Sequence, residues 1–129
     1  MTTLPATDEH DDGGLAARIR IATADAHRAA EHAPFVQDLL AGRLPVEEYA
    51  RLVAQHEAIY RVLEALVAAN RDPTLAPFFV PELVRLPALE ADLAFLAGDD
   101  WRERLTLVEA TRDYCDHLRG LATSWPREI

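Results

Sequence analysis

The feature that most constrains the fold is a run of mostly apolar residues that recurs every three or four positions between residues 45 and 70. The run comprises Tyr49, Leu52, Val53, His56, Tyr60, Leu63, Leu66 and Val67. This period matches one face of an α-helix, and no segment of the chain alternates polar and apolar residues as a half-buried strand does. The sequence therefore predicts an all-α fold with one long helix over Pro45–Asn70, whose wide stripe packs between neighbours.

Proline and glycine residues divide the rest of the chain into shorter helices. The helices that we expect span Leu15–Ala33, Phe35–Ala41, Ala88–Ala97 and Thr106–Ala122, with a short one near Glu82–Leu86. Gly42 and Gly98 stand where a glycine can end a helix. Thr106 and Glu109 have the spacing of a capping box, and Gly120 either weakens the last helix or lets another backbone approach.

The segment between the long helix and the next one carries a phenylalanine pair among prolines. Phe78 and Phe79 lie between Pro77 and Pro81. Proline restricts the backbone, and connections of this kind run over the surface of a domain. We therefore expect the pair to form an apolar plug packed under a rigid loop.

Composition and charge narrow the class of protein. A chain of 129 residues fits one domain with a real core. The formal charge of -9 argues against duplex nucleic acid or an anionic membrane as the main partner. The single cysteine, Cys115, cannot form an intrachain disulfide and suits a reducing cytoplasm. No apolar stretch reaches the length of a bilayer span, and we expect residues 1–14, which are acidic, to form a disordered leader before a single domain at 15–129.

One side of the first expected helix carries an imidazole among small residues. At about 100° per residue, His27 shares a stripe with Ala16, Arg20, Thr23, Ala24 and Glu31. One imidazole nitrogen can bind iron while a carboxylate accepts from the other, and an arginine can pair with an acidic edge group. The stripe is typical of a site for a flat, anionic, metal-containing ligand. Helix position alone leaves open the alternative of a surface histidine without a ligand.

The sequence around His27 resembles a known family. The segment RIRIATADAHRAAEHAPFVQDLLAGRL is similar to the proximal helix and following turn of the heme oxygenases. Further matches follow in the same order, and they are Ile59–Tyr60, Leu63–Glu64, the stretch LAPFFVPEL, the stretch ALEADLAF ending near Gly98 and Trp101, and Tyr114 with Leu118. The resemblance runs from about Leu15 to Trp125 and implies a heme-oxygenase-like helical bundle.

The resemblance also implies roles for individual residues. His27 matches the axial ligand of heme iron, Glu31 is the expected partner that orients it, and Arg20 matches a basic position that contacts a heme propionate. Ala30 and Val36 fall at positions that touch the proximal face of heme. The predicted site thus consists of His27 as iron ligand and of Arg20, Thr23, Ala24, Ala30, Glu31 and Val36 as heme contacts.

The activity implied by the resemblance is oxygen-dependent opening of the heme ring to biliverdin, carbon monoxide and ferrous iron. Heme is then both substrate and cofactor, in heme catabolism or iron release, and a separate reductase or ferredoxin supplies electrons. The sequence ends at Ile129, just where relatives continue towards a glycine-rich distal helix. We therefore expect a truncated proximal half that is inactive alone, because oxygen activation depends on the distal pocket, and that self-associates through exposed apolar faces.

Two alternatives remain at this point. One is a non-catalytic heme-binding or heme-sensing fragment, and the other is a helical interaction module in which His27 is incidental. Outside the stripe of His27, we expect His56 to be a hydrogen-bonded core residue, His32 and His117 to be surface residues, and Cys115 to be a buried small hydrophobe. Tyr60 and Tyr114 read as packed aromatic residues whose hydroxyls are satisfied.

Overall fold

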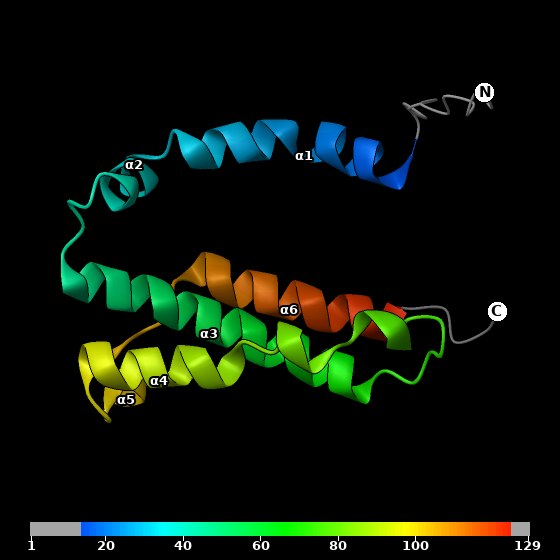
Figure 1. Cartoon of the computed structure of the whole chain (residues 1–129). Coiled ribbons are helices and arrows are strands. Elements are labelled where there is room, and N and C mark those ends of the chain that lie inside the picture. Colours follow the sequence, from blue (N-terminus) through cyan, green and yellow to red (C-terminus); the bar gives the residue numbers. More distant parts are fainter. Residues whose placement is uncertain (1–13, 125–129) are drawn as a thin grey trace, which may run out of the picture. The chain divides into compact units, whose positions relative to one another are not determined.

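The structure is a computed structural model that describes residues 14–124. Its elements are α1 (Leu15–Glu31), α2 (Pro34–Leu40), α3 (Val46–Ala69), the 3-10 helices η1 (Ala76–Phe78) and η2 (Pro81–Leu83), α4 (Leu86–Ala97), α5 (Trp101–Arg104) and α6 (Glu109–Ser124). These residues contain no β-strand, so the predicted all-α class is confirmed (Figure 1). None of the helices in this part of the chain is long and apolar enough to cross a membrane. The predicted leader falls almost entirely outside the described residues.

The chain divides into two compact units, residues 1–43 and 44–129. In the first unit, α1 ends at Glu31 and His32 caps it, two residues before the predicted end. Pro34 opens α2 at a position where its missing N–H leaves no hydrogen bond unmade. The Gln37 side chain in α2 donates to the backbone carbonyl of Glu31 and ties the two helices together. Gly42, with φ of 67°, ends the second helix in the left-handed region, as predicted.

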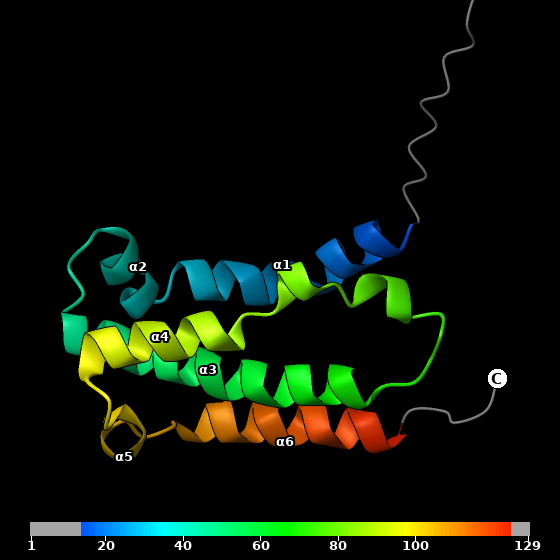
Figure 2. The same cartoon turned by 60° about the horizontal axis from the view of Figure 1, so that its bottom comes forward.

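In the second unit, α4 and α6 both pack against α3, and the two views agree on this arrangement (Figures 1 and 2). Between α3, α4 and α5, one core cluster contains Val53, Ala54, Leu93 and Trp101. Between α3 and α6, a second contains Ala58, Val62 and Cys115. The Cys115 thiol, 4% exposed, lies 3.7 Å from the carbonyl oxygen of Ala58, so the prediction of a buried cysteine is confirmed.

The buried face of α3 differs from the predicted stripe. Its buried residues are Ala50, Val53, Ala54, Glu57, Ala58 and Val62. Small side chains at a contact let helix axes approach more closely, and α3 has a helix packed on it from α4 and another from α6. Tyr49 and Leu63, which the stripe placed inside, are 42% and 39% exposed, and His56 is exposed rather than a core histidine.

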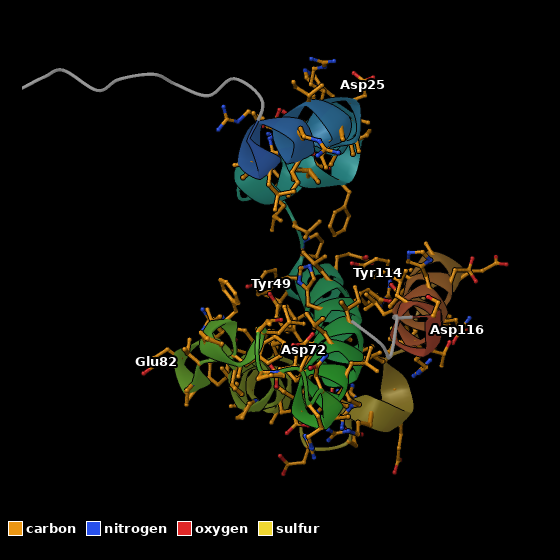
Figure 3. The ribbon with its side chains drawn as sticks, turned by 90° about the vertical axis from the view of Figure 1, so that its right-hand side faces the viewer. Asp25, Tyr49, Asp72, Glu82, Tyr114 and Asp116 are labelled. Carbon is orange, nitrogen blue, oxygen red and sulfur yellow. The ribbon has the colours of Figure 1, made fainter. Side chains whose placement is uncertain are left out.

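Two predictions about the aromatic residues are also wrong. Phe78 at the end of η1 is 68% exposed and the next residue, Phe79, is 38% exposed, so the pair lies on the surface instead of forming a buried plug. Tyr114 is 48% exposed, since α6 turns Thr111 and Cys115 inward; Figure 3 shows Tyr114 at the surface. Tyr60 is half-buried, whereas His32 and His117 are exposed as expected.

The last helix starts later than predicted and without a capping box. Residues 105–108 belong to no helix or strand, and α6 begins at Glu109. The Gln55 side chain on α3 donates to the Thr106 carbonyl at 3.2 Å and accepts the Val108 N–H at 3.0 Å. The hydrogen bonds from Gln55 on α3 therefore take the place of the capping box that was predicted between Thr106 and Glu109. The short helix predicted near residues 82–86 is instead η2, and α5 was not predicted at all.

Candidate functional site

The predicted site residues lie in the first unit, and six of the seven are in α1. Arg20, Thr23, Ala24, His27 and Glu31 follow one another at three- and four-residue steps, so they line one side of this helix. Ala30 precedes Glu31 on a neighbouring line of the same helix, and Val36 is half-buried in α2. α1 has no buried residue, so its polar and small side chains remain accessible in this unit.

His27 and Glu31 form the one close polar pair among these residues. The Nε2 atom of His27 lies 3.0 Å from Oε1 of Glu31, and their side chains are 72% and 55% exposed. When a carboxylate accepts a hydrogen bond from one ring N–H of a neutral histidine, the lone pair of the other ring nitrogen is left for a metal ion. The two side chains are thus in contact in the structure, and their roles toward heme stay a prediction.

Local contacts define the surroundings of the pair. The Thr23 hydroxyl donates to the Ile19 carbonyl at 2.9 Å, so its proton is committed within the helix. Arg28 pairs with Asp25, which projects from α1 in Figure 3. Arg20 is exposed and makes no ion pair with another residue of the described range 14–124.

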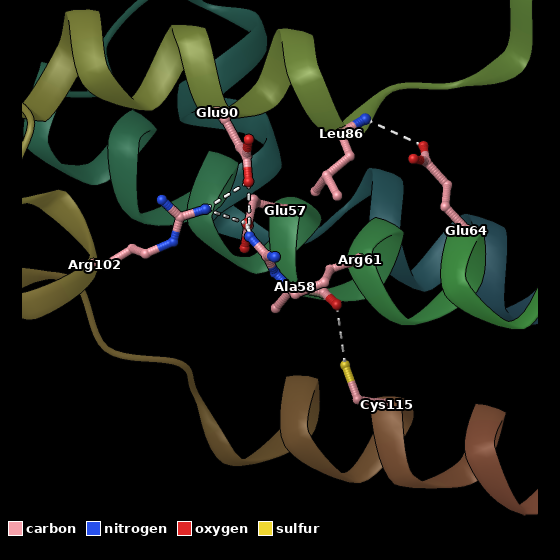
Figure 4. A network of polar contacts seen from close by, with 8 residues as sticks. All are labelled: Glu57, Ala58, Arg61, Glu64, Leu86, Glu90, Arg102 and Cys115. Atoms are coloured by element: carbon pink, nitrogen blue, oxygen red, sulfur yellow. Dashed lines mark hydrogen bonds and ion pairs between the residues drawn. The ribbon is translucent and has the colours of Figure 1, made fainter. Parts of the chain in front are cut away.

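A second polar cluster, in the second unit, was not predicted. Glu57 on α3 is 5% exposed, and its carboxylate accepts from Arg61 and from Arg102, the latter at 3.4 Å. Both arginines also donate to Glu90 of α4, at 2.8 Å and 2.5 Å (Figure 4). The hydrogen bond from Arg61 to Glu57 raises the pKa of the Arg61 guanidinium above its usual value.

The spacing of Glu57 and Arg61 was the one sequence signal for this cluster. Residues four apart on a helix are neighbours, and an acid followed by a base is the favourable order. The same spacing is common on solvated helix faces, so it could not show that Glu57 is buried. The contribution of Arg102 and Glu90 depends on how α4 and α5 pack against α3.

Solved structures with the same backbone arrangement define the class of protein. Heme oxygenase-1 from the cyanobacterium Synechocystis sp. PCC6803 in complex with heme matches with a TM-score of 0.78 and 33% identity, over 87% of this chain and 51% of that chain. The heme oxygenase from Leptospira interrogans matches with a TM-score of 0.74 and 30% identity, over 87% of this chain and 55% of that chain. The fold is therefore that of an all-α protein of the heme oxygenase type.

Sequence comparison supports the same assignment. The family model described as heme oxygenase matches residues 13–129. The heme oxygenase of Takifugu rubripes is 33% identical over 117 residues, which cover 89% of this chain and 42% of that protein. The chain belongs to the heme oxygenase family, as its sequence motifs predicted. It spans about half the length of the curated relatives that it matches.

Proposed function

We propose that this chain binds heme on α1, with the His27 imidazole as the axial ligand of the iron. The observation that carries the proposal is the 3.0 Å contact between His27 Nε2 and Glu31 Oε1. It engages one ring nitrogen and leaves the other for a metal ion, which is how a second protein group commonly orients a ligating histidine. Membership of the heme oxygenase family and the likeness to a heme complex support the same ligand.

The residues present fit a planar, anionic ligand. The His27 ring is 72% exposed, so a ligand can reach it without displacing core side chains. Ala24 and Ala30 have no side chain beyond Cβ and let a macrocycle approach the backbone, and Val36 offers an apolar contact. Arg20 can pair with a propionate group of the ligand through its planar fork of donors.

The activity that we propose is that of the family, heme oxygenase. Bound heme would supply the iron at which molecular oxygen is activated and would itself be the substrate that is opened to biliverdin, carbon monoxide and ferrous iron. A separate reductase or ferredoxin would supply electrons. In this chain, His27 holds the ligand in place and Arg20 fixes the ligand's orientation. Glu31 accepts a hydrogen bond from the His27 ring nitrogen that does not bind the metal, so that nitrogen keeps its proton. The buried free thiol of Cys115 suits a cytoplasmic location.

Heme titration followed by absorption spectroscopy tests the ligand assignment. We expect the chain to give the spectrum of a histidine-ligated heme and His27→Ala to lose it. His56→Ala and His117→Ala are matched controls, because both residues are exposed histidines in helices of the other unit. An unchanged spectrum in His27→Ala, or an equal loss in either control, would remove His27 as the ligand.

A turnover assay distinguishes the proposed activity from heme binding alone. Heme, oxygen and a reductant are supplied to the chain, and biliverdin is measured. Its formation, with loss in His27→Ala, would show oxygenase activity of this chain and would contradict the expectation that the chain is inactive alone. Heme binding without biliverdin supports a non-catalytic heme-binding protein, and the absence of any heme spectrum supports a helical interaction module.

A further inference from the structure

A cleft of about 570 Å³ opens in the second unit between α3, α5 and α6. Ala54, Ala58, Val62, Leu105, Leu107 and Cys115 contribute apolar surface to it, and Trp101 lies at its α5 end. Four arginines also line it, namely Arg61, Arg102, Arg112 and Arg119. A concave site with apolar walls and a few charged groups is the usual form of a small-molecule site, and this volume lies in the usual range.

The charges of the cleft leave a net positive excess. Arg61 and Arg102 are balanced by Glu57 and Glu90, and Arg119 pairs with Asp116 at 2.7 Å. Arg112 makes no ion pair within residues 14–124. Among the described residues, one guanidinium group of the cleft therefore has no carboxylate partner.

The arginines beside Arg112 are held in place and still have donors to spare. Within residues 14–124, the contacts of Arg61 and Arg102 with both carboxylates use only the Nη2 atom of each, and Nε and Nη1 can donate to other acceptors. The Arg102 guanidinium carbon also lies 4.3 Å from the centre of the Trp101 ring. The buried acid Glu57 thus orients both arginines (Figure 4), and the Trp101 ring packs against one of them.

We propose that this cleft binds an organic carboxylate with an apolar body, at a site independent of the proposed heme site. The carboxylate pairs with Arg112, since a guanidinium presents two parallel N–H groups that match the two oxygens of a carboxylate. The body packs against Val62, Leu105 and Leu107. A monoanion fits the one guanidinium group of the cleft without an ion pair in residues 14–124, and the volume exceeds what an inorganic ion needs.

Titration of the 129-residue chain with 1-naphthoate, followed by calorimetry and by amide chemical shifts, tests the proposal. We expect saturable binding at one site, with shifts at residues 105–119. Arg112→Gln should weaken the affinity about tenfold, because a hydrogen-bonded charge is lost from the site. Arg71→Gln is the matched control, because Arg71 is an exposed arginine of the same unit that donates only to the backbone carbonyls of Ala68 and Asn70.

Two further probes separate the two halves of the ligand. Acetate carries the carboxylate alone, and 1-naphthalenemethanol carries the apolar body without charge. Both should bind at least about tenfold more weakly than 1-naphthoate. The proposal is overturned by the absence of saturable 1-naphthoate binding, by equal affinity in Arg112→Gln with helicity unchanged, or by equal affinity for the uncharged alcohol.

Discussion

The carboxylate of Glu64, in the middle of the second half of α3, accepts the backbone N–H of Leu86 at the start of α4, with 3.1 Å between Oε1 and the nitrogen (Figure 4). The same oxygen accepts the N–H of Arg85 at 2.6 Å. The first N–H groups of a helix have no partner within it. α4 has no side-chain cap at its own N-cap residue, so α3 provides that cap from 21 and 22 residues away.

Replacement of Glu64 should therefore destabilise the second unit. We expect Glu64→Ala to lower the free energy of unfolding by about 0.5–2 kcal/mol, the usual cost of a lost N-cap. Glu64→Gln should cost less, because its amide oxygen still accepts. Asp92→Ala is the control, since Asp92 is an exposed acid of α4. Urea unfolding measures all three, and equal midpoints for Glu64→Ala and Asp92→Ala would contradict the capping role.

Two large apolar residues of α4 should differ sharply in their contribution to stability. Leu93 is 0% exposed in the core, whereas Phe95 is 89% exposed. Leu93→Ala should lower the free energy of unfolding by about 2–5 kcal/mol, because it leaves a cavity. Phe95→Ala should change it by no more than about 0.5 kcal/mol. Thermal unfolding followed by circular dichroism measures both variants. Similar losses of stability for Leu93→Ala and Phe95→Ala would contradict the placement of Leu93 in the core.

Two glycines should respond in opposite directions to alanine. Gly98 has φ of 85°, and an added Cβ would lie 3.2 Å from Oδ1 of Asp100. Gly98→Ala should cost about 1–2 kcal/mol, since residues with a Cβ avoid this conformation. Gly120 lies within α6 with nothing within 4 Å of an added Cβ, so no other backbone approaches it. Gly120→Ala should stabilise α6 by about 0.5–1 kcal/mol, measured by chemical unfolding.

The pKa of Asp72 should lie below its ordinary value because of Thr74. The Thr74 hydroxyl and its backbone N–H donate to Oδ1 of Asp72 at 2.7 Å and 2.8 Å, and the hydroxyl is the larger cause. A lowered folded-state pKa means that this contribution to stability is present above the unfolded pKa and is lost as pH falls through the folded one. Thr74→Val should raise the pKa of Asp72 in an NMR titration. No change on removing the hydroxyl would refute this cause.

Loss of the Glu31 carboxylate should weaken heme binding without removing it. If Glu31 orients His27, Glu31→Gln should lower the affinity for heme about 10- to 100-fold, the usual effect of losing a group that orients a metal ligand. Glu47→Gln is the control, because Glu47 is an exposed acid in another helix. Heme titrations of the three proteins give the affinities. Equal values for the variants would show that the contact with His27 has no role in binding.

The helices and the contact between His27 and Glu31 were predictable because both depend on residues that are close together in the sequence. Helical periodicity and the glycines at 42 and 98 located most helix ends to within about two residues, a common discrepancy at helix ends. The histidine and the acid are neighbours by helix geometry alone. The start of α6 was not predictable, because Gln55 satisfies the backbone of residues 106–108 from α3.

By itself, the amino-acid sequence determined the all-α class, the order of the main helices and the candidate heme ligand, because each depends on residues within a few positions of one another. Only the tertiary structure decided that α3 buries its small-residue face, that Glu64 caps α4, and that arginines from α3, α5 and α6 line one cleft. These features join residues far apart in the chain, and local pattern carries no information on which helix face a neighbour will cover.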